Sequence, residues 1–171
     1  MPWWNEALYD TCSLITLDKI FQDHPEMETH FRMVLALEAS FRSDQLRKAT
    51  ASRMQPRVTY LDAPAIPDLR NILATAHLPK VLAQVDKLIF ATAVHHGLTV
   101  VTGDKRLAQA IAQKGLYVGN IALALKTLVV SRVLSTAECN AILADLVKKR
   151  DYLLPRNHPQ TWTTLRCYTF P

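Results

Sequence analysis

The chain has 171 residues, of which 49% are hydrophobic and 20% charged, and its formal net charge is +5. These values are typical of a folded globular protein and exclude a globally disordered chain. The apolar runs fall far short of the about 20 residues that a membrane span needs, and the first residues have no signal-peptide pattern. We therefore expect a cytoplasmic protein with no membrane contact. The three cysteines are widely spaced and form no zinc-binding motif, so we expect them to be free thiols.

Short apolar runs of strand type alternate with helical periods along most of the chain. In chain order, we predict strands at residues 6–9, 32–37, 57–61, 98–102 and 116–118. In the same order, we predict helices at 13–21, from Glu38 through Leu46, at 68–76, from about 80, from Asp86 to Gly97, from Asp104 to Gly115, at 121–130 and at 136–149. Asp86 and Asp104 are the expected N-caps of their helices, and Gly97 is the expected end of the first of these.

The order helix, strand, helix, strand between residues 85 and 120 predicts parallel strands joined by right-handed crossovers. We therefore predict an α/β fold, an α/β/α sandwich with a mainly parallel central sheet and an α-helical C-terminal extension. Residues 1–130 are expected to form the main domain. Residues 131–171 are expected to be a helical extension and an irregular tail packed on the same domain.

Four acidic residues stand where a strand or turn gives way to a helix: Asp10, Glu38, Asp86 and Asp104. In a parallel α/β domain these junctions gather at one edge of the sheet, so the four carboxylates are expected to converge. Carboxylate oxygens are the ligands that Mg²⁺ and Mn²⁺ prefer. The sequence therefore predicts an acidic site for a hard divalent cation.

The segments around these acids resemble the PIN-domain ribonucleases, a family that includes the VapC-type toxins of toxin–antitoxin systems. The resemblance rests on residues 10–15 (DTCSLI), Glu38, residues 86–93 (DKLIFATA) and residues 99–104 (TVVTGD), and it covers roughly residues 6–125. The helix that opens with Asp86 and the strand that ends in Thr-x-Asp are its most specific parts. One departure is Cys12, where many members carry a small hydroxyl residue; Ser13 stands beside it.

The resemblance implies a metal-dependent endoribonuclease whose PIN-like nuclease domain spans residues 1–130. In that family pattern Asp10, Glu38, Asp86 and Asp104 are both the metal ligands for one or two Mg²⁺ or Mn²⁺ ions and the catalytic residues. It also implies an RNA substrate, a toxin role, a homodimer and a small antitoxin that covers the pocket. Because the helices after residue 121 make the chain longer than a compact toxin, a housekeeping RNA-processing nuclease is one alternative. A PIN-like RNA- or protein-binding module with little catalysis is another.

Several of these residues also have simpler roles open to them. The three aspartates can cap helices, which contributes about 1 kcal/mol each, and Glu38 can pair with Arg42 one turn on. Asp18 is expected on a solvated helix face. Trp3 and Trp4 are expected to pack the amino terminus and not to stack on bases.

Three basic residues stand beside the acids and are candidates for contacts to substrate phosphates: Lys87, Lys105 and Arg106. Simple surface solvation is the alternative for them.

Two other enzyme classes do not fit the sequence. A haloacid-dehalogenase-like phosphatase needs a second aspartate two residues after the first, and this chain has Cys12 there. A P-loop or Rossmann nucleotide site needs a glycine-rich turn, and the four glycines form neither GxGxxG nor GxxxxGK.

Overall fold

The structure is a computed structural model that describes residues 2–42, 58–76, 78–151 and 160–170. Its centre is a five-stranded sheet in the order β3-β2-β1-β4-β5. Every strand pair in it is parallel, as the alternation of elements predicts. The strands are β1 (Ala7–Tyr9), β2 (Val34–Leu37), β3 (Val58–Leu61), β4 (Val100–Val101) and β5 (Val118–Gly119).

Helices connect these strands and continue beyond the last one. They are α1 (Thr11–Asp23), α4 (Ile66–Thr75), α5 (Gln84–His96), α6 (Lys105–Gln113), α7 (Ile121–Val130), α8 (Thr136–Lys148) and α9 (Trp162–Leu165). Two 3-10 turns, η1 (Pro25–His30) and η2 (Glu38–Arg42), stand before and after β2. None of the helices in the described ranges is long and apolar enough to cross a bilayer.

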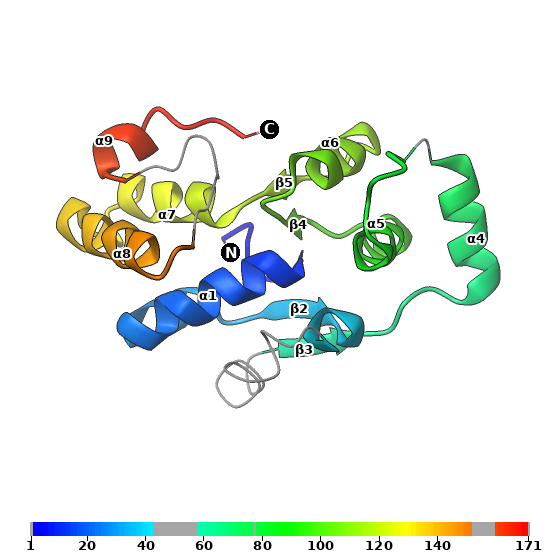
Figure 1. The fold of residues 1–171 in the computed structure, drawn as a ribbon, viewed down its shortest axis with the longest axis horizontal. Coiled ribbons are helices and arrows are strands. Elements are labelled where there is room, and N and C mark those ends of the chain that lie inside the picture. Colours follow the sequence, from blue (N-terminus) through cyan, green and yellow to red (C-terminus); the bar gives the residue numbers. More distant parts are fainter. Residues whose placement is uncertain (1, 43–57, 77, 152–159, 171) are drawn as a thin grey trace.

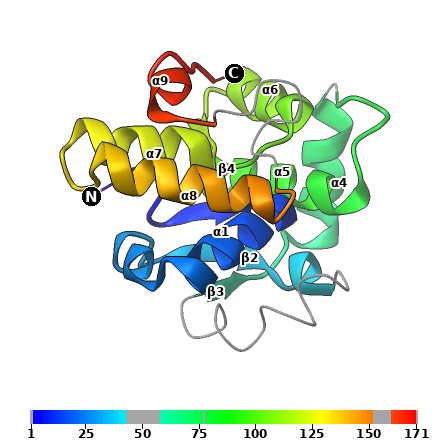
Figure 2. The same ribbon diagram turned by 60° about the vertical axis from the view of Figure 1, so that its left-hand side comes forward.

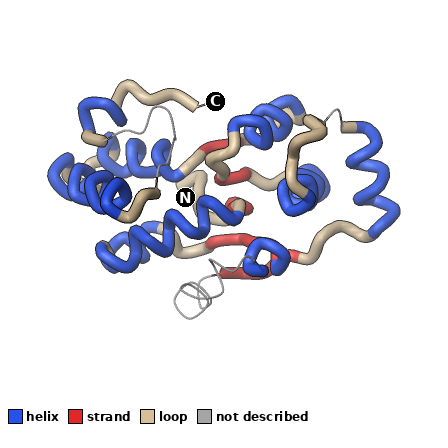
Figure 3. Tube along the Cα trace, viewed as in Figure 1, coloured by secondary structure: helices blue, strands red, loops and turns tan. Residues whose placement is uncertain are grey.

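The helices flank the sheet on both faces (Figures 1 and 3). Side chains of a strand alternate between the two faces, so Ala7 and Tyr9 enter one core and Leu8 enters the other. The first core is shared with α1, α7 and α8, and the second with α5 and α6. The view in Figure 2 shows α7 and α8 lying together over the α1 side of the sheet. The predicted α/β architecture with helices on both faces is therefore confirmed.

Several helix starts differ from the sequence prediction. The helices α1 and α4 each begin two residues earlier than expected, and residues 80–82, where a helix was expected, form a turn. The helix expected from Asp86 begins at Gln84, with Ala83 as its N-cap, so Asp86 lies inside its first turn. The helix expected after Glu38 is a 3-10 turn as far as it is described, and Leu46 lies outside the described residues. Gly97, by contrast, ends α5 in the left-handed conformation with φ of 66°, as predicted.

The C-terminal helices pack on the first core and are tied to α1 by polar contacts. The helix α8 begins with a capping box between Ser135 and Glu138. At its other end the His24 ring lies 3.1 Å from an Asp145 carboxylate oxygen, and Lys149 pairs with Asp23 at 2.8 Å. In the tail, Trp162 and Tyr168 pack against the same core, and Phe170 packs against the second one.

We predict a small acid-dependent loss of stability from the contacts of the Asp145 carboxylate. A hydrogen bond from Lys148 lowers the pKa of Asp145 below its ordinary value of 3.8; burial opposes this shift, and His24 adds to it. A carboxylate whose pKa is lower in the folded state stabilises the fold above the unfolded pKa, and this is lost as the pH falls through the folded pKa. Asp145→Asn should therefore lower the free energy of unfolding near neutral pH, and the difference from the wild type should vanish in acid below pH 3.8. Urea unfolding at several pH values measures both, and an equal difference at every pH would contradict the assignment.

The two tryptophans at the amino terminus pack as expected. Trp4 is 2% exposed and donates its indole N–H to the His30 carbonyl at 2.8 Å. Trp3 lies against Gly119 at the end of β5, so closely that a Cβ atom at position 119 would overlap the indole ring. The sheet edge thus requires glycine at this position for steric reasons.

Gly119→Ala should destabilise the protein because the added methyl group collides with the Trp3 ring. Overpacking of this kind costs about 1–3 kcal/mol. The same substitution in a Trp3→Ala background should cost much less, because the obstacle has gone. Denaturant unfolding of the four proteins in this double-mutant cycle provides the test; equal costs in both backgrounds would show that Trp3 is not the obstacle.

Candidate metal centre

The acidic junctions meet at the carboxyl end of the sheet, where its strand order reverses. Asp10 directly follows β1, and Thr102 directly follows β4. These strands are neighbours, with Leu8 opposite Val100 and Tyr9 opposite Val101. The chain leaves β1 toward β2 on one side and later returns as β4 on the other. Such a switch point is where parallel α/β proteins bind their ligands.

Asp10 is a buried carboxylate held by hydrogen bonds from two elements. It is 3% exposed. Its Oδ1 accepts the backbone N–H of Ser13 at 2.6 Å, so it caps α1, and its Oδ2 accepts the Thr102 hydroxyl at 2.5 Å. Burial raises the pKa of Asp10, the hydrogen bonds from Thr102 and Ser13 lower it, and the charge of Asp104 raises it again, with a net upward shift.

Thr102 connects Asp10 to Asp104. Its hydroxyl, which donates to Asp10, accepts the backbone N–H of Asp104 at 3.0 Å. Asp104 in turn caps α6 by accepting the N–H groups of Arg106 at 2.7 Å and Leu107 at 3.2 Å, as predicted. Both bonds go to Oδ1, which leaves Oδ2 outside the cap. Capping and metal binding by Asp104 are therefore compatible.

Asp86 approaches the same point from α5. It is partly exposed and sits in the first turn of that helix. Burial raises its pKa, and so do the charges of Asp10 and Asp104, while a hydrogen bond with the Ala83 backbone lowers it. The structure thus brings three of the four predicted carboxylates close enough to repel one another.

Glu38 lies at the same edge of the sheet, but its charge is not among the causes that shift the pKa of Asp10 or Asp86. It opens η2 at the end of β2 and is exposed. The turn reaches the start of α1 through a 3.4 Å hydrogen bond from the Thr11 hydroxyl to the Ser40 carbonyl. The charge of Glu38 acts instead on Tyr60, whose pKa is raised by burial first and then by this carboxylate. The possible partner of Glu38, Arg42, is described only in its backbone.

Cys12 and Ser13, two residues of α1 that follow Asp10 in the chain, have different surroundings. Ser13 is buried, and hydrogen bonds from its side chain and its backbone lower the pKa of Asp10. Cys12 is a free thiol; the residue is open to solvent on one side, and protein surrounds its sulfur on the other. Burial raises the pKa of Cys12 to about 11, and the charges of Asp10, Asp86, Asp151 and Asp104 act in the same direction.

Two further acids have surroundings that the sequence did not indicate. Asp151, which follows α8, adds to the negative charge around Cys12, although it pairs with Lys19 at 2.9 Å and accepts the Thr16 hydroxyl at 3.0 Å. Asp18 is 3% exposed, so the prediction of a solvated position was wrong. It lies buried because α1 has core contacts with the sheet and with α8; its Oδ2 accepts from Gln22 at 2.8 Å.

The three converging aspartates suit a divalent cation chemically, although they are not gathered into a finished ligand shell. Within the described ranges, no three His, Cys, Asp or Glu side chains form a group arranged to hold an ion. The donors are nevertheless carboxylate oxygens, which hard cations prefer. Burial first, and then the charges of neighbouring aspartates, raise the pKa values of Asp10 and Asp86, and a nearby cation would favour the charged carboxylates. Metal binding by these residues stays a prediction.

The three basic candidates for substrate contact lie beside these acids. Lys87 follows Asp86 on α5 and is partly exposed, while Lys105 and Arg106 are exposed in the first turn of α6. Positive charge and free N–H groups at a helix start favour a phosphate.

A scan against protein-family models finds no match to this chain, and a search of curated proteins also finds none.

Thr102→Val should destabilise the protein because it removes the hydroxyl that serves both Asp10 and the Asp104 N–H. Leaving a buried acceptor without its donor costs about 1–3 kcal/mol. Thr92→Val is the matched control, since Thr92 is also buried and no described residue hydrogen-bonds its hydroxyl. This control should be neutral or slightly stabilising. Thermal unfolding of both variants tests the role of Thr102, and equal effects would show that its hydroxyl is not special.

Proposed function

We propose that this chain is a metal-dependent ribonuclease that hydrolyses RNA phosphodiester bonds. The observation that carries the proposal is the meeting of Asp10, Asp86 and Asp104 at the switch point of the sheet. No lysine or arginine of the described residues is among the causes that shift the pKa of Asp10 or Asp86. A cation from solution is therefore the natural partner for this negative charge.

Asp10, Asp86 and Asp104 would hold Mg²⁺ or Mn²⁺, with Glu38 at the same edge as a further candidate ligand. A divalent ion bound there would supply an acidic water as the nucleophile and charge neutralisation at the scissile phosphate. The Thr102 hydroxyl orients Asp10, and the helix caps orient Asp10 and Asp104. Because these groups are fixed by hydrogen bonds before any ligand binds, little reorganisation is needed.

The substrate class follows from charge. The net charge is +5 although an acidic cluster occupies the switch point, so positive charge lies elsewhere on the chain. Lys87, Lys105 and Arg106 flank the acids and are suited to neighbouring phosphates of the same strand. The resemblance to PIN-domain ribonucleases supports RNA as that polyanion. We extend the proposal to the toxin of a toxin–antitoxin system, in which a homodimer is neutralised by a small antitoxin that covers the acidic edge.

Asp86→Asn and Asp104→Asn should separate function from stability. Asparagine retains a hydrogen-bonding oxygen at each helix start but removes the charge. We expect melting temperatures close to that of the wild type, Mn²⁺ affinity reduced by more than about tenfold, and loss of cleavage of labelled RNAs. Asp68→Asn is the matched control, because Asp68 is an exposed acid in the first turn of α4, and it should change none of these.

The outcomes of this experiment distinguish the parts of the proposal. A wild type that binds no Mn²⁺ in calorimetry would contradict the metal site. Asn variants that cut RNA as fast as the wild type would contradict the catalytic role of these aspartates. A wild type that binds Mn²⁺ and RNA but cuts no RNA in the panel would leave a binding module and contradict the ribonuclease.

A further inference from the structure

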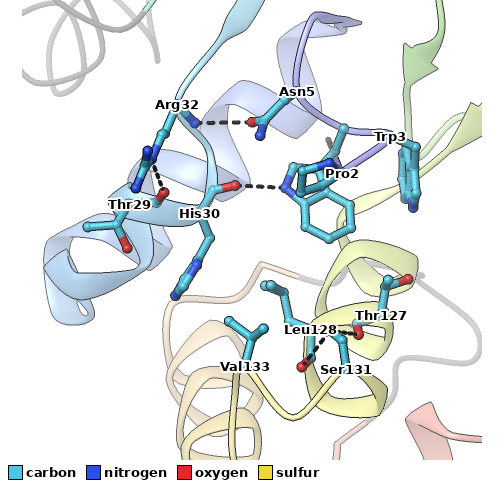
Figure 4. A pocket seen from close by; sticks show the side chains of 11 residues that line it. Pro2, Trp3, Asn5, Thr29, His30, Arg32, Thr127, Leu128, Ser131 and Val133 are labelled. Atoms are coloured by element: carbon cyan, nitrogen blue, oxygen red, sulfur yellow. Dashed lines mark hydrogen bonds between the residues drawn. The ribbon is translucent and has the colours of Figure 1, made fainter.

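A hollow lies at the amino-terminal edge of the sheet, opposite the acidic edge. Its walls come from the segment before β1, from the end of η1 and the residues before β2, and from the end of α7 with the turn that follows (Figure 4). Its volume is about 620 Å³. Trp3 precedes β1 and Asp10 follows it, so the strand separates this hollow from the acidic edge.

Apolar side chains line much of the hollow, and exposed apolar residues neighbour its lining residues. Pro2, Trp3, Leu128 and Val133 are among the lining residues, and Val133 is 51% exposed. Other large apolar side chains nearby are also exposed: Met33 beside Arg32, Val130 beside Ser131, and Tyr117, whose ring lies 5.3 Å from that of Trp3. An apolar surface that extends past its own pocket is typical of a protein contact. A small molecule in the hollow would leave these neighbours uncovered.

The hollow has one permanently charged side chain in its lining, that of Arg32, and hydrogen bonds hold it in place. Arg32 and His30 line it, and none of its lining residues is acidic; Glu6 and Glu28 belong to the same segments but are not in the lining. The Arg32 Nε donates to the Thr29 carbonyl at 2.8 Å, which fixes the guanidinium, and its outer nitrogens have no partner among the described residues. The Arg32 backbone N–H donates to Asn5 at 3.1 Å (Figure 4).

We propose that this hollow docks a segment of a partner protein that combines apolar side chains with carboxylates. The apolar side chains would enter between Trp3, Leu128 and Val133, and a carboxylate would pair with the outer nitrogens of Arg32. A second copy of this chain fits the hollow less well as a binding partner. A two-fold contact would bring the Arg32 side chains of both copies together on a chain of net charge +5, and like charges facing each other disfavour the complex.

A pair of synthetic peptides tests this chemistry on the full chain. Both are fluorescein-labelled helices with leucine along one face; one carries glutamate on the other face and its match carries lysine. Such helices bind grooves through their apolar face. By fluorescence anisotropy the glutamate peptide should bind the wild type at least about tenfold more tightly than the lysine peptide. The inference does not depend on the proposed nuclease function.

Three variants locate the site. Val133→Glu should lower the affinity for the glutamate peptide by about tenfold or more, because the substitution places a carboxylate in the apolar hollow. Val81→Glu is the matched control, since Val81 is 67% exposed and is not in the lining, and it should leave binding unchanged. Arg32→Glu should reverse the preference in favour of the lysine peptide. Melting temperatures confirm that each variant is folded, and the RNA and Mn²⁺ behaviour of Val133→Glu should match the wild type.

Several results would overturn the proposal. They are a wild type that binds neither peptide, equal binding of both peptides, an equal effect of Val133→Glu and Val81→Glu, or an unchanged preference in Arg32→Glu. Concentration-dependent dimerisation abolished by Val133→Glu would replace the acidic partner with a second copy of the chain.

Discussion

The hydrogen bond between Thr102 and Asp10 is the contact on which the acidic edge depends. A carboxylate that is 3% exposed is costly to bury unless donors satisfy it. One donor comes from the first turn of α1, and the other comes from the residue after β4. The second can reach Asp10 only because β4 pairs with β1 in the observed register. The same threonine accepts from the Asp104 N–H, so the contact that makes the burial of Asp10 tolerable also brings a second carboxylate beside it.

This arrangement leaves electrostatic strain in place, and the proposed function accounts for it. Hydrogen bonds from Thr102 and Ser13 do not fully offset the effects of burial and of Asp104 on the pKa of Asp10. Asp86 adds a third charge from α5. Natural proteins keep strained charges of this kind mainly at functional sites. The two ends of the sheet are thus specialised differently: carboxylates gather where the strands end, while apolar side chains and Arg32 surround a hollow where they begin.

The parts of the structure that local patterns determine were predictable from sequence. The parallel sheet, the end of α5 at Gly97, and the caps at Asp104 and Ser135 follow from spacing and capping chemistry within a few residues. The start of α5 could not be predicted in this way, because Gln84 and Val85 are compatible with a helix and extend it by half a turn before Asp86. The burial of Asp18 and the approach of Asp151 depend on α8 packing over α1, which no local pattern contains. Glu38 was predicted at the correct edge, but its distance from the three aspartates depends on side-chain directions that spacing does not determine.

The most direct test of the account is a crystal structure of the wild type soaked in Mn²⁺, with anomalous diffraction used to locate the ion. The account predicts an anomalous peak at the carboxyl ends of β1 and β4, within ligand distance of Asp10, Asp86 and Asp104. Asp10 and Asp104 should keep the hydrogen bonds that hold them, and the remaining closure should come from the Asp86 side chain. A peak at another place, or no peak at a Mn²⁺ concentration that saturates binding in solution, would contradict the claim that the switch-point aspartates form a metal centre.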